Sequence, residues 1–211
     1  MLTNKSVDYY ITQTASGEPT PGGGSVSALV GSLGAALISM VNNLTVGKKA
    51  YEELPDDVKA EFQKNFKEIE ELMEDLKAII EEDTHAFSKV MDAFKLPKST
   101  DEEKEVRTQA IQDGYKVALE VPLRCAKKCL RALELQDIFA EYGNVQAITD
   151  VGVGTLLSYA GVEGALFNVI INVGAIKDQE FKAEIEAEID STLSRAKELK
   201  EELLKVVYSR L

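Results

Sequence analysis

Residues 56–94 read DDVKAEFQKNFKEIEELMEDLKAIIEEDTHAFSKVMDAF. Apolar side chains recur along this stretch at alternating spacings of three and four residues, which is the period of one face of an α-helix. These side chains are Val58, Phe62, Phe66, Ile69, Met73, Leu76, Ile80, Phe87, Val90 and Phe94. One position of the series, between Ile80 and Phe87, holds Asp83 instead. The stretch therefore predicts one long amphipathic helix that carries an acid on its buried face.

The rest of the chain also reads as helix, because strand-type alternation never extends beyond a few residues. Signals that start helices are found at Ser6, at Asp56 or Asp57, at Ser99 or Thr100, and at Asp178. We expect helices at residues 6–14, 25–46, 56–94, 100–133 with a kink at Pro122, 145–160, 162–176 and from 178 onward. The short connections predict one all-α domain, residues 1–211, built as an up-and-down bundle with long antiparallel helices.

The charge balance excludes some classes of protein. Acids exceed bases by 36 to 24, and a formal charge of −12 argues against a nucleic-acid partner, which needs clustered Lys and Arg. Hydrophobic residues make up 45% of the chain, enough to exclude disorder. The one histidine, His85, leaves no room for a multi-histidine site, so we predict no bound metal.

Two stretches nearly free of charge belong either to a core or to a membrane. Residues 19–47 carry no charged side chain, and residues 151–176 carry only Glu163. Residues 26–46 are long enough to span a bilayer, but polar side chains are spread along them. Small residues at helical spacing predict instead a core helix crossed closely by its neighbours, with no membrane: Ala28, Gly31, Ala35, Ser39 and Asn43.

The compartment follows from the cysteines and the first residues. Cys125 and Cys129 are too few for a disulfide framework, which favours reduced thiols in a reducing compartment. Residues 1–18 are polar and have no apolar run typical of a signal peptide. We therefore expect a cytoplasmic protein.

Two acids lie in apolar surroundings and are candidates for chemistry. Asp83 projects with the buried stripe, and burial of a carboxyl moves its pKa toward values that suit a general acid or base. Asp150 shares a helix face with Val153 and Leu157. For each acid the alternative is a structural role, in which the carboxyl is hydrogen-bonded to a neighbouring helix.

Amides and glycines supply further candidates. Asn168 and Asn172 are four residues apart on an apolar helix, so they either bond to another helix or read the edge of a heterocycle. The run Pro21-Gly22-Gly23-Gly24-Ser25 leads into a helix start, where free backbone N–H groups attract anions. Its spacing is not that of a Walker loop, and no strand precedes it.

Several motifs together resemble the cyclodeaminase domain of formiminotransferase-cyclodeaminase, and the resemblance runs over nearly the whole chain. The motifs are Thr20–Ala28 (TPGGGSVSA), Gly34–Val41 (GAALISMV), Lys95–Thr100 (KLPKST), Val121-Pro122, Gly143-Asn144 and Phe167–Asn172 (FNVIIN). Free-standing members of this family include methenyltetrahydrofolate cyclohydrolases. The resemblance implies an all-helical protein that assembles as a homodimer or a higher homo-oligomer, with its active site near the dimer interface.

The resemblance also implies chemistry on a folate substrate. The family's catalytic aspartate lies just before an Ala-Phe pair on the long helix, and the matching residue here is Asp83, before Ala86-Phe87. We expect formiminotetrahydrofolate cyclodeaminase activity, with methenyltetrahydrofolate cyclohydrolase as the first alternative and a non-catalytic folate-binding or scaffold protein as the second. Neither reaction requires a metal or redox cofactor, so the tetrahydrofolate derivative is the substrate and no cofactor is expected.

The residue roles follow from this expectation. Asp83 and Asp150 are the catalytic candidates. The glycine run is expected to contact substrate through backbone donors, and two lysines are expected to bind the anionic glutamate tail, because an acidic protein needs a local basic spot for such a group. The substrate-binding candidates are Pro21, Gly22, Gly23, Gly24, Ser25, Asn144, Asn168, Asn172, Lys48 and Lys49.

Overall fold

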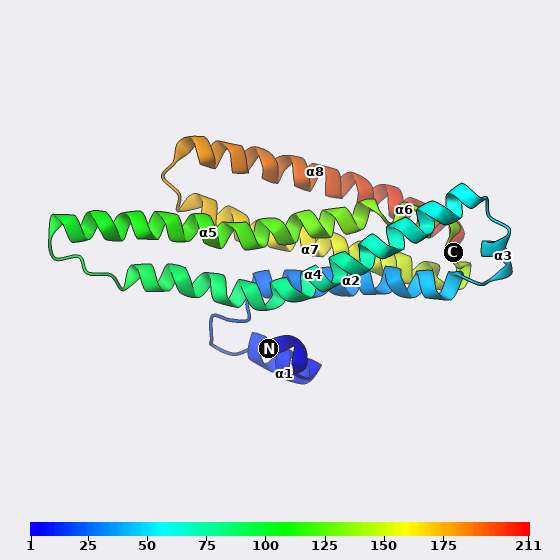
Figure 1. The fold of residues 1–211 in the computed structure, drawn as a ribbon, viewed down its shortest axis with the longest axis horizontal. Helices are drawn as coiled ribbons and strands as arrows, with labels where there is room; N and C mark the ends of the chain where they lie inside the picture. Colours follow the sequence, from blue (N-terminus) through cyan, green and yellow to red (C-terminus); the bar gives the residue numbers. More distant parts are fainter.

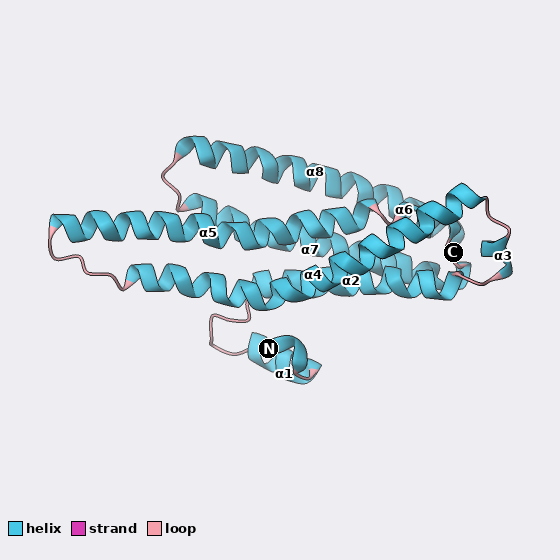
Figure 2. Cartoon of the chain, in the orientation of Figure 1, coloured by secondary structure: helices cyan, strands magenta, loops and turns pink.

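The computed structural model describes residues 1–211, apart from the side chains of residues 87–89. The part it describes is helical and shows no strand, which confirms the all-α class (Figures 1 and 2). Phe87, one member of the predicted apolar stripe, lies outside the described side chains. The elements are η1 (Leu2–Asn4), α1 (Val7–Thr14), α2 (Gly23–Thr45), α3 (Lys49–Glu52), α4 (Asp56–Phe94), α5 (Asp101–Glu134), α6 (Asp137–Tyr142), η2 (Val145–Ala147), α7 (Ile148–Gly174) and α8 (Gln179–Arg210).

The two helices nearly free of charge, α2 and α7, pack directly against each other. The amphipathic helices α4 and α5 cover one side of this pair, and α8 lies along α7 and α5 (Figure 1). The predicted stripe of α4 supplies much of the contact, since Phe62, Ile69, Leu76 and Ile80 are almost completely buried. Helix α1 stands beside the bundle, joined to it by the segment that enters α2 (Figure 1).

Glycines, which have no Cβ atom, allow α2 and α7 to approach closely. A Cβ on Gly34 would lie 2.6 Å from Ser158 Oγ and 2.9 Å from the carbonyl oxygen of Gly154. A Cβ on Gly161 would lie 2.7 Å from Cys129 Sγ and 3.2 Å from the Cα of Gly31. The contacts run in opposite chain directions, because Gly164 meets Ser27 where Gly154 meets Ile38.

The prediction of two helices at residues 145–160 and 162–176 was wrong. One helix, α7, runs from Ile148 to Gly174. Gly161, which separates the two predicted helices, is a buried contact with α2 and α5 and does not break the helix. Glycine inside a helix costs about 1 kcal/mol relative to alanine, and close packing of the facing helix offsets that cost.

Other helix boundaries differ in detail from the predictions. Helix α2 begins at Gly23 and not at Ser25, while α5, predicted as one helix over 100–133, runs from Asp101 to Glu134 with Pro122 inside it. Asp56 and Asp57 lie in the first turn of α4, whose N-cap is Pro55. Gly47 follows α2 with a φ of 78°, a left-handed conformation that glycine adopts without strain. The short helices α3 and α6 were not predicted.

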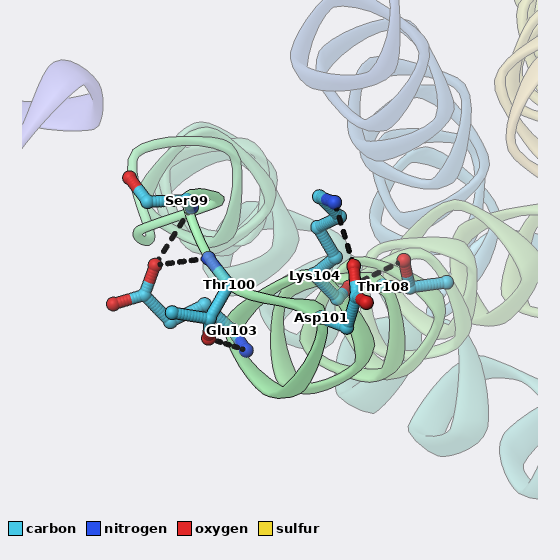
Figure 3. Close-up of polar contacts among 6 residues, drawn as sticks. All are labelled: Ser99, Thr100, Asp101, Glu103, Lys104 and Thr108. Carbon is cyan, nitrogen blue, oxygen red and sulfur yellow. Dashed lines mark hydrogen bonds and ion pairs between the residues drawn. The ribbon is translucent and has the colours of Figure 1, made fainter.

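The start of α5 is a complete capping box (Figure 3). Thr100 Oγ1 accepts the N–H of Glu103 at 3.1 Å, while the Glu103 carboxylate accepts the N–H groups of Ser99 at 2.7 Å and Thr100 at 3.1 Å. Thr100 is therefore the cap, and Ser99 belongs to the preceding turn. Ser6 and Asp178 cap α1 and α8 as predicted, accepting the N–H groups of Tyr9 and Phe181.

By length and composition, α2 and the segment Val145–Gly174 are each apolar enough to cross a membrane. Within the bundle, 56% of the relevant window of α2 and 39% of that of α7 are buried. The small residues Ala28, Gly31 and Ala35 face the interior as predicted, whereas Asn43 is exposed. Packing of α2 against α4 and α7 thus accounts for the apolar side that faces the core.

The close approach of α2 and α7 predicts the effect of a single methyl group. Gly34→Ala is expected to lower the free energy of unfolding by about 1–3 kcal/mol, because the nearest atoms include the backbone of α7, which cannot move aside easily. Gly174→Ala is the control, since the space around that position is open, and it should change stability by less than about 1 kcal/mol. Urea unfolding measures both, and equal stability of the two variants would contradict this packing argument.

Candidate functional site

Asp83 of α4 lies against the first turn of α2. The N-cap of α2 is Gly22, which has no side chain to satisfy the helix's free N–H groups. The Asp83 carboxylate takes that role from a different helix, accepting the backbone N–H of Ser25. A Cβ on Gly24 would lie 2.1 Å from Asp83 Oδ1, so this approach requires glycine at that position. The carboxyl is therefore held at a helix N-terminus by contacts that both elements supply.

Two opposing effects set the proton affinity of this carboxyl. Burial raises the pKa of Asp83 above its ordinary value, and the N–H of Ser25 lowers the pKa in part by stabilising the charged form. The positive end of the α2 dipole acts in the same sense as that N–H group. Burial dominates, which leaves a carboxyl that holds a proton more readily than a solvated aspartate.

Ser25, whose N–H faces Asp83, is itself held in place by its hydroxyl. It is fully buried, its hydroxyl donates to the carbonyl oxygen of Ile80 at 3.0 Å, and it lies 2.8 Å from the hydroxyl of Tyr10. Pro21 is buried too, and neither residue is among those that line the adjacent pocket. The structure therefore gives Pro21 and Ser25 a supporting place, where the sequence predicted direct contact with the substrate.

A pocket of about 200 Å³ opens in front of Asp83, between the start of α2 and the helices α4, α5 and α7. It brings together four of the predicted groups: the Gly22–Gly24 run, Asp83, Asn168 and Asn172. The complete lining is Pro19, Thr20, Gly22, Gly23, Gly24, Asp83, Ala86, Ala118, Pro122, Asn168, Ile171 and Asn172.

The side-chain amide of each of the two asparagines on α7 donates one hydrogen bond to a backbone carbonyl oxygen. Asn168 Nδ2 donates to the oxygen of Gly164 at 2.9 Å, and its side chain lies beside Gly23. Asn172 Nδ2 reaches the oxygen of Ala118 at 3.5 Å. Ala118 precedes Pro122 by four residues, and because proline has no N–H, that oxygen has no helical partner at Pro122. Each amide thus fixes its own position while presenting a carbonyl oxygen as an acceptor.

Four predicted site residues lie at the other end of the bundle. Asn144 donates to the carbonyl oxygen of Leu44 and to Thr45 Oγ1, beyond the last turn of α2. Lys48 borders a separate pocket with Asn144, and Lys49 forms an exposed ion pair with Glu53 at 3.7 Å.

Asp150 belongs to this distant group as well. It lies in the first turn of α7, and the helical rise of about 1.5 Å per residue puts it about 27 Å from Asn168. Within one chain, therefore, Asp150, Asn144, Lys48 and Lys49 do not reach the pocket of Asp83. Their spacing along helices was visible in the sequence, but the end of the bundle at which each helix terminus lies was not.

Tyr10 and several apolar residues of the lining were not predicted from the sequence. Nothing in the pattern around Tyr10 distinguishes it from its exposed neighbour Tyr9, because its role depends on where the short helix α1 lies. Pro122 was noted only as a kink, although it lines the pocket. Among the described residues, no three His, Cys, Asp or Glu side chains group together as metal ligands. The expectation that no cofactor is needed stays a prediction.

Comparison with known proteins gives consistent matches. A family model described as formiminotransferase-cyclodeaminase matches residues 6–207. The chain is 41% identical to a methenyltetrahydrofolate cyclohydrolase of Methylorubrum extorquens over 211 residues, the full length of both proteins. It is 36% identical to the formimidoyltransferase-cyclodeaminase of Gallus gallus over 197 residues, which is 93% of this chain and 36% of that protein. The crystal structure of formiminotetrahydrofolate cyclodeaminase from Thermotoga maritima superposes with a TM-score of 0.86 at 27% identity, covering 99% and 98% of the two chains.

The fold and the pocket define a helical protein with a partly buried acid at the N-terminus of a glycine-rich helix. The chain belongs to the formiminotransferase-cyclodeaminase family, as the motif resemblance indicated.

The raised pKa of Asp83 predicts a pH-dependent cost in stability. A carboxyl whose pKa is higher in the folded than in the unfolded state stabilises the fold below about pH 3.8, and this contribution is lost as pH rises through the folded-state pKa. At neutral pH the ionised, partly desolvated carboxylate is therefore unfavourable. Asp83→Asn is expected to gain stability relative to wild type between pH 4 and pH 7, measured by urea unfolding at both pH values.

Asp92→Asn on the same helix provides the matched control. Asp92 is exposed and pairs with Lys95 on the surface, so its substitution should change stability by less than about 0.5 kcal/mol at either pH. A stability difference between Asp83→Asn and wild type that is the same at pH 4 and pH 7 would contradict the titration assigned to Asp83.

Proposed function

We propose that this chain catalyses the making or breaking of a carbon–nitrogen bond between the one-carbon group and a nitrogen of a tetrahydrofolate, with Asp83 as the acid and base. The observation that carries the proposal is the position of Asp83: a carboxyl of raised pKa, at the wall of a pocket and against a helix N-terminus. General acid–base catalysis by such a group contributes about 10²–10⁴-fold to a rate.

The same carboxyl serves either of two reactions. In hydrolysis of a methenyl bridge, the carboxylate takes one proton from the attacking water, and the resulting carboxylic acid gives it to the ring nitrogen as the carbon–nitrogen bond breaks. The second proton of the water is released to solvent as the hydroxyl on the carbon becomes the formyl oxygen. In cyclodeamination, it takes the proton of the attacking nitrogen and then protonates the departing amine, so that ammonia leaves and the methenyl ring closes. Each reaction uses the same carboxyl first as a base and then as an acid, which suits a pocket with one acid, Asp83, in its lining.

The remaining pocket residues orient the substrate. Backbone N–H groups of Gly23 and Gly24 belong to the first turn of α2, where the helix dipole favours partial negative charge on a ligand. The carbonyl oxygens of Asn168 and Asn172 are acceptors for N–H groups at the edge of a pterin ring. No charged side chain besides Asp83 lines the pocket among the described residues.

Similarity over the full length of both proteins to the Methylorubrum extorquens cyclohydrolase supports placing hydrolysis first. Similarity to the Thermotoga maritima protein, whose chain is also covered almost completely, supports formiminotetrahydrofolate cyclodeamination as the second candidate. A folate-binding scaffold without turnover is the third. The two thiols, Cys125 and Cys129, are free and buried, which supports the cytoplasm as the site of action.

A spectrophotometric assay with methenyltetrahydrofolate and with formiminotetrahydrofolate separates these candidates. We expect turnover of at least one substrate, and a fall in kcat of about 10²–10⁴-fold in Asp83→Asn, because the amide cannot accept and return a proton. Asp92→Asn should keep the wild-type rate. If wild type turns over neither substrate, the enzyme proposal fails; if Asp83→Asn retains full activity, the role given to Asp83 is wrong.

We propose further that the chain functions as a homodimer joined through α2 and α7. These helices carry several exposed apolar side chains, whereas exposed apolar residues on a typical monomer are scattered singly. They are Leu33, Met40, Leu44, Val153, Leu156, Phe167, Ile170 and Ile171, which are between 38% and 74% exposed.

A twofold axis across the middle of α2 would bring the far end of a second copy toward the pocket of the first. That end carries Lys48, Lys49, Asn144 and Asp150, the predicted site residues that one chain leaves distant. In this arrangement the two lysines are the basic groups proposed for the glutamate tail of the substrate.

The dimer is tested by the mass of the protein in solution. Wild type is expected to have the mass of two chains by light scattering, and Met40→Glu that of one chain, because a buried unpaired carboxylate at the interface is unfavourable. Val106→Glu is the control, since Val106 is 64% exposed on α5 and belongs to neither α2 nor α7. A single-chain mass for wild type at micromolar concentration would contradict the proposal.

A further inference from the structure

Helix α1 lies against the bundle through Tyr10, which packs on the core, and through few polar groups. Every residue of α1 is at least partly exposed, and an apolar space of about 220 Å³ lies between it and the helices α2 and α4. Two polar links join this N-terminal part of the chain to the bundle: the hydroxyl of Tyr10 lies 2.8 Å from Ser25 Oγ, and the N–H of Thr3, in the preceding η1, donates to Glu81 Oε1 at 3.0 Å. The segment that follows α1 supplies Pro19 and Thr20 to the wall of the Asp83 pocket.

Ser25 joins α2 to α4 with two donors. Its hydroxyl donates to the carbonyl oxygen of Ile80, and its backbone N–H donates to the carboxylate of Asp83. Ile80 and Asp83 are one turn apart, so Ser25 is fixed against the turn of α4 that carries the acid. A hydroxyl has one hydrogen, and that of Ser25 is used by Ile80. The hydrogen between the two hydroxyls therefore comes from Tyr10.

We propose that Tyr10 is a positioning residue for Asp83, acting through Ser25. The inference rests on the proposed function of Asp83 and extends it to α1. The hydroxyl of Tyr10 donates to the oxygen of Ser25 and so fixes the orientation of that buried side chain. Ser25 in turn fixes the N–H group that holds the Asp83 carboxylate at the start of α2. Tyr10 itself does not line the pocket, so it acts without touching substrate.

The direction of the effect follows from the charge on Asp83. A hydrogen bond to the carboxylate stabilises its ionised form and lowers its pKa. Without the Tyr10 hydroxyl, Ser25 is held less firmly, the N–H bond weakens and the carboxyl keeps its proton to higher pH. The pKa of Tyr10 is itself raised, first by burial and then by the nearby charges of Asp83 and Glu81.

Few other titratable groups surround Asp83. On α4 these are Glu81, Glu82 and His85. Glu81 accepts a hydrogen bond from the N–H of Thr3. From α5, Arg124 pairs with Glu82. From α1 there is Tyr10, while the first turns of α2 carry no charged residue, and Asn168 and Asn172 face the pocket from α7. A comparison of two tyrosine variants leaves all of the other groups unchanged.

Tyr10→Phe and Tyr9→Phe form a matched pair on one helix. Each removes one hydroxyl and keeps the ring, but Tyr9 is exposed and its hydroxyl lies outside the chain of bonds to Asp83. The first measurement is titration of the Asp83 carboxyl by ¹³C NMR in protein without substrate, assigned with Asp83→Asn. We expect the midpoint to move to higher pH in Tyr10→Phe and to stay at the wild-type value in Tyr9→Phe.

The second measurement is the pH profile of turnover. For Tyr10→Phe we expect kcat to fall about 10-fold with KM within about 2-fold of wild type, and the acidic limb of the profile to move to higher pH. A midpoint in Tyr10→Phe equal to that of wild type overturns the inference, whatever happens to kcat. If wild type turns over neither folate, the proposed function fails, and the NMR titration still decides whether Tyr10 positions Asp83.

Discussion

The contact between α2 and α7 is the constraint on which the rest of the structure depends. Glycines at positions 31, 34, 154 and 161 let the two backbones approach until side-chain and main-chain atoms of facing helices touch. That closeness fixes the register of α2, and the register of α2 decides where its first turn lies. Asp83 then meets this turn because α4 packs on the same helix. A site made of groups from four helices thus follows from packing at positions that have no side chain.

The fold was largely predictable, because its signals are local and repeated. The apolar series on α4 gave a helix whose bounds the structure reproduces, and the caps at Ser6, Thr100 and Asp178 follow from side-chain chemistry alone. Gly161 is ambiguous in the sequence because glycine favours both chain breaks and close helix contacts. Sequence spacing cannot distinguish these two uses, whereas the facing atoms of α2 and α5 do so at once.

The site was predictable only in part. Asp83 stood out because an acid interrupted an apolar series, and the structure brings Gly22–Gly24 and the two asparagines, predicted as substrate contacts, to one pocket with it. Asp150, Asn144, Lys48 and Lys49 were grouped with them, yet one chain keeps them at the far end. Tyr10 went unnoticed because its importance comes from a single hydrogen bond between distant segments. Interactions of that kind depend on the docking of elements, and a periodic pattern does not record them.

The approach of Asp83 to Gly24 ties two distant positions of the chain together. Any side chain at position 24 would occupy the space of the carboxylate, and a longer acid at position 83 would have to displace the start of α2. Position 24 is therefore restricted to glycine while position 83 carries a side chain as long as that of aspartate. Among natural variants of this chain, a residue other than glycine at position 24 should occur only where position 83 carries a shorter side chain. Gly24 and Asp83 are therefore constrained as a pair, although they are 59 positions apart in the sequence.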